Sequence, residues 1–321
     1  MKNIKWMWFI LFGLIMALAW SVSAQKNGAD DPIDNNPVLG RWDFTVYDID
    51  GVFPSWLELT EAEGGLQGRF QGRHSSWRPV RDIRYDARTL RIALPAYDYE
   101  REGGGDLVYT AEIVNEALEG VDDREVRFRG LPAPELKASA DLSWGDPVEL
   151  LRDDDLSAWM PRSLGSPNGW SLSNGVLSAT PPSTDLVTRR RFTDFKLHLE
   201  FNVPEKSNSG VYLRGRYELQ ITDDFGKEAE SHGCGGLYGF IAPAKMMVNP
   251  AGQWNSWDIT LIGRNLTLVF NGETVIAEEE IPGITGSAIN SREAEPGPIM
   301  LQCHGAPIYY RNIVIRPAEL E

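Results

Sequence analysis

The sequence has few of the residues that mark redox or metal sites. It contains two cysteines and four histidines in 321 residues. Metal-binding spacings such as C-x-x-C and H-E-x-x-H do not occur, so no standard metal motif is present. Two cysteines also cannot form a disulfide framework of the kind that holds small exported domains together. Neither a metal centre nor a redox motif is therefore indicated.

Positive charge is also scarce. The chain has 31 Lys and Arg residues against 46 Asp and Glu residues, which gives a net charge of −15. Binding to nucleic-acid phosphates requires a basic face, so an acidic chain of this kind is not expected to bind nucleic acid. A membrane-surface charge pattern is missing as well. The charge balance is typical of an exported protein that acts on neutral ligands.

Long apolar runs are confined to the N-terminus. Lys2 and Lys5 precede an apolar run over residues 6–20, and the small-residue pattern Val22-Ser23-Ala24 follows it. This order predicts a cleaved secretory signal peptide over residues 1–24, with secretion or export to the periplasm. An uncleaved membrane anchor is the alternative, which the short run disfavours. No cysteine follows the run, so a bacterial lipid anchor is not expected. After cleavage, no membrane contact is expected.

Helix signals are scarce in the remainder, whereas strand signals are abundant. Residues 25–36 are polar and predict a flexible segment. Over residues 37–135, short alternating strands recur at spacings of roughly ten residues, which predicts a small β-barrel or meander domain. A stretch rich in proline and small residues predicts a linker at 136–145. Longer strands fill residues 146–321 and favour an all-β jelly-roll sandwich.

Asn-Gly pairs supply the clearest local signals in this second region. Asn174-Gly175 and Asn271-Gly272 each lie between alternating apolar runs, and both predict tight hairpins.

Strand alternation divides the side chains of the second region between two faces. Apolar residues such as Leu197, Val211 and Leu219 are expected to face inward. The outward positions of four strands carry an unusually selective polar set: His198, Glu200, Tyr212, Arg214, Glu218, Gln220, Gln302 and His304. If these strands line a concave sheet, the set forms a cleft for hydroxyl-rich ligands, with Tyr238 and Trp254 as stacking platforms. The alternative is a convex, merely solvated sheet.

Several ordered segments resemble one known family. They are PVELLRDDDLSAW, GWSLSNGVLSA, FTDFKLHLEFNVPEKSNSGVYLRGRYELQITD, HGCGGLYG, PAGQWNSWDITLIG and GPIMLQCHGAPIYYRNIVIRP. Together, over residues 146–321, they resemble the 3-keto-disaccharide hydrolases, whose fold is a concanavalin- or laminarinase-like jelly roll. Members usually read L-Q-D-H-G where this chain reads Leu301-Gln302-Cys303-His304-Gly305. That departure puts in doubt any role that the aspartate has in relatives.

The resemblance implies cleavage of glycosides oxidised at carbon 3, by hydrolysis or by elimination followed by hydration. Such chemistry needs a base, an acid and a positive group near the ketone oxygen. The candidates are His304 as base, Glu218 or Glu200 as acid, and Arg214 or a divalent cation as electrophile. The expected partner is a neutral oxidised sugar or glycoside. A non-catalytic carbohydrate-binding module or lectin and a scaffold module are the alternatives.

The segment SHGCGGLYG, residues 231–239, favours a wall over a reaction centre. A nucleophilic Cys234 would require His232 to fold back over Gly233. Its glycines instead indicate a tight loop at the rim of the cleft that presents Tyr238 and His232 to a sugar. A disulfide between Cys234 and Cys303 is a further candidate, because both are expected beside the same face.

Overall fold

The computed structural model describes residues 36–86, 88–137, 142–152 and 155–320. The chain divides into two units, Met1–Pro37 and Val38–Glu321, and the second contains all the described strands. The expected signal peptide, residues 1–24, and nearly all of the expected flexible segment lie outside the described residues. Within the described part of the chain, no helix is long and apolar enough to cross a membrane.

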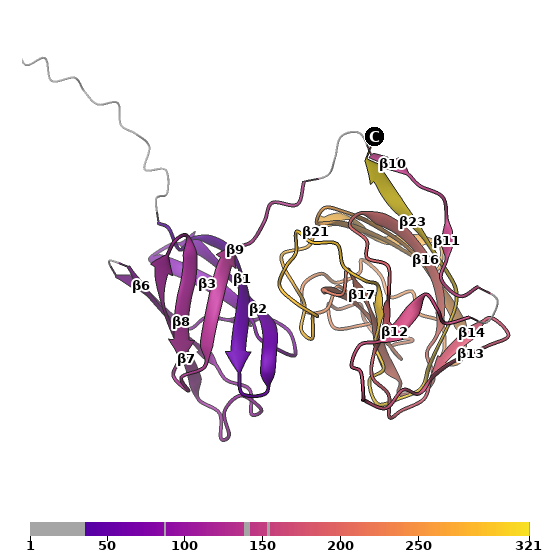
Figure 1. The fold of residues 1–321 in the computed structure, drawn as a ribbon, viewed down its shortest axis with the longest axis horizontal. Coiled ribbons are helices and arrows are strands. Elements are labelled where there is room, and N and C mark those ends of the chain that lie inside the picture. Colours follow the sequence, from indigo (N-terminus) through magenta and orange to yellow (C-terminus); the bar gives the residue numbers. More distant parts are fainter. Residues whose placement is uncertain (1–35, 87, 138–141, 153–154, 321) are drawn as a thin grey trace, which may run out of the picture. The chain divides into compact units, whose positions relative to one another are not determined.

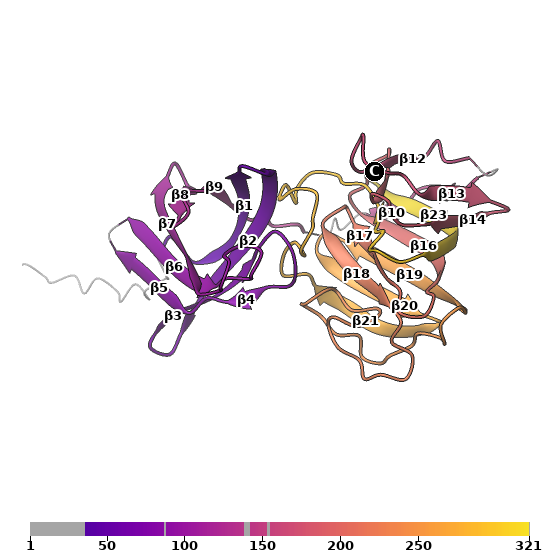
Figure 2. The same ribbon diagram turned by 90° about the horizontal axis from the view of Figure 1, so that it is seen from below.

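The first sheet consists of nine antiparallel strands in the order β4-β3-β2-β1-β9-β8-β7-β6-β5. Their bounds are β1 (Gly40–Asp48), β2 (Gly51–Ala62), β3 (Gly65–Gln71), β4 (Arg78–Pro79), β5 (Asp82–Asp86), β6 (Thr89–Pro95), β7 (Asp106–Val114), β8 (Ala117–Asp122) and β9 (Arg127–Pro132). Between β4 and β5, Val80 N–H donates to Gly68 of β3 and Arg81 N–H donates to Ala93 of β6. These bonds connect the two ends of the sheet, so it closes into the small meander barrel that the sequence predicts (Figure 2).

The barrel interior is filled by alternate residues of its strands. On β1, Trp42, Phe44 and Val46 are buried, as period-two alternation requires. Phe44 stacks on Phe128 of β9 with ring centroids 5.0 Å apart. The barrel core therefore combines stacked aromatic rings with aliphatic side chains such as Leu57 and Ile92.

The second region contains two sheets (Figure 1). The larger has the order β13-β14-β23-β16-β19-β20-β21, with β10 and β11 also paired to β23, and the smaller has the order β12-β15-β22-β17-β18. The larger sheet contains β10 (Leu142–Trp144), β11 (Val148–Glu149), β13 (Trp170–Ser173), β14 (Val176–Ala179), β16 (Phe195–Asn202), β19 (Trp254–Ile262), β20 (Asn265–Phe270), β21 (Glu273–Glu280) and β23 (Ile308–Leu320). The smaller contains β12 (Trp159–Pro161), β15 (Leu186–Thr188), β17 (Asn208–Leu213), β18 (Tyr217–Thr222) and β22 (Met300–Leu301).

One hydrophobic core lies between these two sheets. It takes Leu197 and Leu199 from β16 and Val211 and Leu219 from β17 and β18, all of them buried. The alternation therefore predicts the inward residues correctly on both sheets. The result is the all-β jelly-roll sandwich that the sequence indicates.

Both predicted hairpins are present. Asn174 and Gly175 join β13 to β14, and Asn271 and Gly272 join β20 to β21, with positive φ at all four residues. Two consecutive positive φ values define the type I′ turn that matches the twist of a hairpin, and Asn-Gly tolerates them best. Within the segment predicted as a linker, 136–145, the described strand β10 pairs with the end of β23.

The barrel and the jelly roll are packed together within the second unit. On β2, Leu57 belongs to the barrel core, whereas its neighbour Trp56 points the other way and belongs to the jelly-roll core. The Trp56 ring meets Phe240 edge-on at 5.6 Å. Both faces of β2 are therefore buried at this point.

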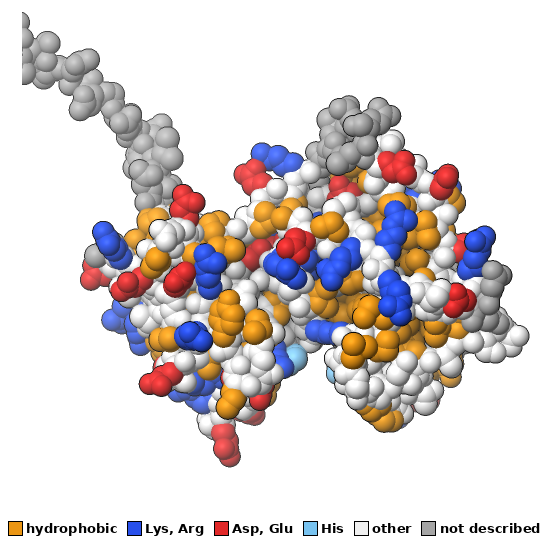
Figure 3. All heavy atoms as spheres, in the orientation of Figure 1, with side chains coloured by type: hydrophobic (Ala, Val, Ile, Leu, Met, Phe, Trp, Pro, Cys, Tyr) orange, Lys and Arg blue, Asp and Glu red, His pale blue; other side chains and the backbone are white. Residues whose placement is uncertain are grey.

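Charged side chains of both signs are scattered over the face of the molecule in Figure 3.

Candidate active site

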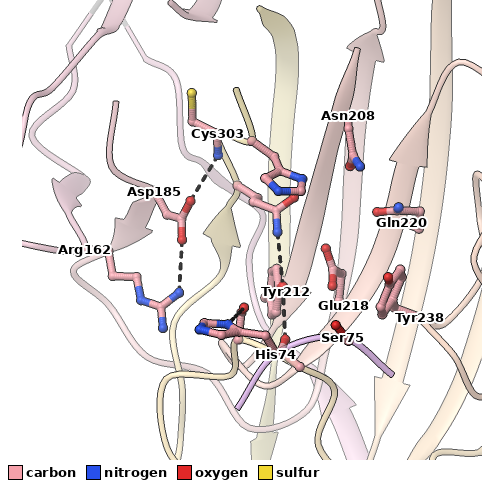
Figure 4. A pocket seen from close by; sticks show the side chains of 14 residues that line it. His74, Ser75, Arg162, Asp185, Asn208, Tyr212, Glu218, Gln220, Tyr238 and Cys303 are labelled. Atoms are coloured by element: carbon pink, nitrogen blue, oxygen red, sulfur yellow. Dashed lines mark hydrogen bonds and ion pairs between the residues drawn. The ribbon is translucent and has the colours of Figure 1, made fainter. Parts of the chain in front are cut away.

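A pocket of about 410 Å³ opens over the smaller sheet of the jelly roll. Its volume falls within the range of small-molecule sites. Figure 4 shows its polar side chains converging from several elements. The lining residues are His74, Ser75, Arg162, Asp185, Asn208, Tyr212, Glu218, Gln220, Tyr238, Gly286, Ser287, Gln302, Cys303 and His304.

Glu218 lies on the floor of this pocket. Its neighbours Tyr217 and Leu219 on β18 enter the core, so alternation turns Glu218 to the other face. Only 5% of Glu218 is exposed. Gly210 on β17 leaves the space that the carboxyl group of Glu218 occupies, because a Cβ at position 210 would lie 2.5 Å from Oε1 of Glu218.

The carboxyl group of Glu218 is held in its protonated form. The pKa of Glu218 is raised to about 8: burial is the largest cause, the nearby carboxylate of Asp185 adds to it, and hydrogen bonding to Tyr212 and Gln302 offsets part of the effect. A carboxyl group that keeps its proton at neutral pH can act as a general acid. Glu218 therefore meets the protonation requirement of the acid role predicted for it.

Tyr212 lies opposite Glu218 in the register of β17 and β18. Its hydroxyl donates to the carbonyl of Gly286 at 3.2 Å and accepts from Nε2 of Gln302 at 3.2 Å. Burial raises the pKa of Tyr212 well above its usual value, so the phenol stays neutral. Tyr212 and Gln302 form a fixed, uncharged group beside the acid.

An ion pair forms another side of the pocket. Nη1 of Arg162 lies 3.0 Å from Oδ2 of Asp185, and the backbone N–H of Cys303 donates to Oδ1 of Asp185 at 3.1 Å (Figure 4). Arg162 directly follows β12 and Asp185 directly precedes β15, and the pairing of these strands brings the two residues together. Arg162 is thus an arginine that faces the ligand space.

Three amide side chains contribute acceptors that lack a partner. Oδ1 of Asn208, Oε1 of Gln220 and Oε1 of Gln302 are buried and have no hydrogen-bond partner among the described residues. All three residues line the pocket. Unpaired buried acceptors are rare, since each forfeits a hydrogen bond. A ligand with several hydroxyl donors would satisfy them.

The structure brings together six of the eleven residues predicted for catalysis or binding. Tyr212, Glu218, Gln220, Gln302 and Tyr238 line the pocket together with His304. Their catalytic roles stay predictions, because placement alone does not test chemistry.

The remaining predicted residues lie elsewhere, and the expectation that they share the cleft is wrong. His198 and Glu200 are on β16 of the larger sheet, where His198 pairs with Asp258 and Glu200 with Arg311. Two sheets of a sandwich turn their outer faces in opposite directions, so β16 cannot contribute to a pocket over β17 and β18.

Arg214, Trp254 and His232 also lie outside the pocket lining. Arg214 directly follows β17 and turns into the interior, where Nη2 donates to the carbonyl of Gly263 at 2.7 Å. Trp254 lies under the guanidinium of Arg311, 4.0 Å from its ring centroid. His232 is beside the pocket wall, with Nε2 2.9 Å from Oγ of Ser76.

The glycine-rich segment 231–239 forms a tight loop beside β18, as predicted. The backbone N–H of Gly235 donates to the backbone carbonyl of Gln220, and that of Tyr238 donates to the backbone carbonyl of Glu218. Positive φ at Gly235 and Gly239 allows the loop to follow the strand this closely. The loop therefore places Tyr238, though not His232, in the pocket wall.

The candidate disulfide is not formed. Both cysteines are free: Cys234 is fully buried in the core, while Cys303 lies half-buried at the pocket. Burial raises the pKa of both thiols, so neither is an activated thiolate.

Among the described residues, no group of three or more His, Cys, Asp or Glu side chains is arranged to hold a metal ion.

Several pocket residues are missing from the sequence-based set. Asn208 shares a strand face with Tyr212 and could have been found by the same alternation. Arg162 and Asp185 flank strands of three residues, which are too short to show a period. His74 and Ser75 come from the barrel, and only the packed structure reveals their position.

Comparison with solved structures gave distant matches over about half of the chain. A candidate glycosyl hydrolase from Parabacteroides distasonis is 27% identical, with a TM-score of 0.49, and the match covers 56% of this chain and 92% of that one. A second candidate glycosyl hydrolase from the same organism is 22% identical, with a TM-score of 0.45, and the match covers 54% of this chain and 94% of that one. The curated proteins contain no match.

A family model gives the more specific result. The model of the 3-keto-alpha-glucoside-1,2-lyase-like domain matches residues 146–316, which is more than half of the chain and includes all jelly-roll residues of the pocket. This match agrees with the resemblance found in the sequence motifs. The chain belongs to the 3-keto-alpha-glucoside-1,2-lyase-like family.

Proposed function

We propose that the protein cleaves glycosides whose sugar is oxidised to a ketone at carbon 3. Family membership supports a carbohydrate-active jelly roll. The observation that carries the finer proposal is the buried carboxyl group of Glu218, which has a pKa of about 8 and lies in a pocket with three unpaired amide acceptors. The ligand is a neutral, hydroxyl-rich sugar rather than a charged one.

The reaction begins with proton removal from carbon 2. A ketone at carbon 3 makes this proton acidic, and His304 at the pocket is the candidate base. The electron pair of the broken C–H bond forms an enolate on the oxygen at carbon 3. Arg162 replaces Arg214 as the candidate for stabilising that negative charge, because it lines the pocket and Arg214 does not.

Collapse of the enolate then breaks the glycosidic bond. The ketone re-forms, a double bond forms between carbons 1 and 2, and the leaving oxygen takes a proton from Glu218. The products are an unsaturated keto sugar and an alcohol. Water then adds across the new double bond: its hydroxyl bonds to carbon 1, carbon 2 takes back the proton from His304, and the proton released by the water returns to Glu218. The net result is hydrolysis, with both groups in their starting protonation states. Ordinary glycosidases instead use two carboxyl groups at a saturated carbon.

The test is incubation with a 3-keto-glucoside and with the matching unoxidised glucoside, with products followed by mass spectrometry. We expect release of the aglycone from the keto form alone. Glu218→Gln should lower turnover by about 10²- to 10⁴-fold, the usual size of a general-acid contribution. Runs with and without a chelator measure any need for a divalent cation.

Binding of both sugars without any product would contradict the proposal and favour a non-catalytic carbohydrate-binding module. Glu200→Gln is the matched control, because Glu200 lies on the larger sheet, paired with Arg311. Its turnover should equal that of the unmodified protein. If Glu218→Gln and Glu200→Gln behaved alike, Glu218 would be removed from the mechanism.

A further inference from the structure

The barrel contributes a wall to the pocket. Residues 72–77, which we call the barrel loop, connect β3 to β4, and two of them, His74 and Ser75, line the pocket beside the jelly-roll residues (Figure 4). The matched family region begins at residue 146, so this wall lies outside it.

The barrel loop is bound firmly to two loops of the jelly roll. Nδ1 of His74 lies 3.0 Å from Oγ of Ser287, and Nε1 of Trp77 donates to the carbonyl of Gly239 at 2.7 Å. The backbone N–H of Ser287 also donates to the carbonyl of Arg73 at 2.9 Å. These bonds join three positions of the barrel loop to two separate loops of the jelly roll, at Gly239 and Ser287.

Two glycines of the jelly roll make this approach sterically allowed. A Cβ at Gly239 would lie 2.4 Å from Cβ of Ser76, and a Cβ at Gly286 would lie 2.3 Å from the carbonyl oxygen of Ser75. Contacts this short would push the loop away. The jelly roll is therefore shaped to receive the barrel loop at these points.

The barrel also fixes the loop from behind. Ser75 has a positive φ of 62°, which is unfavourable for a residue other than glycine. The buried side-chain amide of Gln71 donates to the carbonyls of Gly72 and Ser75, at 3.1 and 2.8 Å. Tyr99 donates to the carbonyl of His74 at 3.3 Å. The wall is thus held in one conformation before any ligand arrives.

The remaining ring nitrogen of His74 is available to a ligand. Nδ1 is occupied by Ser287, and no partner of Nε2 is found among the described residues. Burial lowers the pKa of His74, and the nearby Arg73 and Arg162 lower it further, so the ring is neutral at pH 7. A neutral imidazole offers a hydrogen bond in either tautomer.

We propose that the barrel loop determines which leaving group the site accepts, with His74 binding a second sugar. A single ring over Glu218, flanked by Tyr238, is held by the jelly roll alone. A ligand with a second ring must reach the walls, and His74 and Ser75 form one of them. This inference rests on the proposed cleavage of 3-keto-glycosides and adds a specificity-determining residue to it.

The test compares two substrates that differ only in the leaving group: methyl 3-keto-glucoside and a disaccharide oxidised at carbon 3 of its non-reducing glucose. For His74→Ala, kcat/KM with the disaccharide should fall about fivefold, the effect of one lost hydrogen bond. With the methyl glycoside it should stay within about twofold. His74→Gln retains a hydrogen-bonding side chain and should recover most of the loss. Equal changes with both substrates, or no change with either, would overturn the inference.

The control is His198→Ala, which removes a histidine from the larger sheet and should leave both substrates unaffected. If the unmodified protein turns over neither substrate, the proposed function fails, and the inference is then decided by calorimetry with the unoxidised disaccharide. Weaker binding of the disaccharide by His74→Ala than by His198→Ala would support the role of His74 in binding a second sugar. Equal binding, or none by any variant, would overturn it.

Discussion

At the scale of single residues, the site depends on where Glu218 is placed. The residue sits in a strand whose neighbours fill the core, and Gly210 leaves the space that its carboxyl group occupies. Burial and the nearby Asp185 both favour the neutral form, so the pKa of Glu218 rises to about 8. A single residue therefore has the protonation state that general acid catalysis requires.

The pH profile tests this directly. Because an acid must hold its proton to donate it, kcat for a 3-keto-glucoside should be highest below pH 8 and fall about tenfold per pH unit above it. The measurement is kcat between pH 5 and pH 10 (roughly the range that brackets this titration). Glu218→Gln should lose this descending limb together with most of its turnover. An alkaline limb that persisted in the variant would assign it to another group.

At the scale of elements, β1 adds a buried charge network where the barrel meets the jelly roll. Asp43 on β1 is almost fully buried, close to Glu293 and Arg264. Arg264 holds Glu293 through two bonds of 2.7 Å. Burial and the charge of Glu293 both raise the pKa of Asp43, so Asp43 keeps a proton that it would lose in the unfolded chain.

The consequence is a stability that falls with rising pH. Since the folded state binds this proton more tightly, the free energy of unfolding decreases as pH rises from the ordinary pKa of aspartate toward the raised one. Asp43→Asn should flatten that decrease, by up to about 1.4 kcal/mol per pH unit. Denaturant unfolding at several pH values measures it.

Asp50→Asn in the adjoining β1–β2 turn is the control, because Asp50 is exposed. Its unfolding curve should keep the pH dependence of the unmodified protein. Parallel pH dependences for Asp43→Asn and Asp50→Asn would show that Asp43 is ionised in the folded protein.

The strands and hairpins show which features of the fold follow from local sequence patterns. Period-two alternation identified the inward residues of β16, β17 and β18, and the Asn-Gly pairs located two hairpins, because both signals are local. Alternation could not say which sheet a strand joins, so His198 and Glu200 were grouped with Glu218 although they lie on the other sheet. Arg214 broke the alternation at a strand end, where positive φ turns the chain.

At the scale of the whole molecule, the barrel and the jelly roll share contacts within one compact unit, Val38–Glu321. Trp56, a residue of the barrel strand β2, packs into the jelly-roll core, and residues of the barrel loop line the pocket. Neither contact follows from a local pattern, because each joins residues that are far apart in the sequence. The barrel is therefore part of the site as well as part of the fold.

Removing the Trp56 side chain tests how much the contact between the barrel and the jelly roll stabilises the fold. Trp56→Ala should lower the free energy of unfolding by about 3–5 kcal/mol, since the side chain is fully buried and its loss leaves a cavity. Tyr47→Ala, on the same barrel and partly exposed, should cost less than about 1 kcal/mol. Calorimetric unfolding measures both. A Trp56→Ala variant as stable as Tyr47→Ala would show that the barrel is only loosely attached.

The contact around Trp56 also limits how parts can be exchanged between proteins. A Cβ at position 283 would lie 2.3 Å from Nε1 of Trp56, so Gly283 and Trp56 can change only together. A related jelly roll with a larger residue at that position could not accept this barrel without losing the contact. In any chimera, the two domains therefore have to be transplanted as a matched pair. A barrel grafted alone would bring its loop but not the jelly-roll glycines that leave room for it.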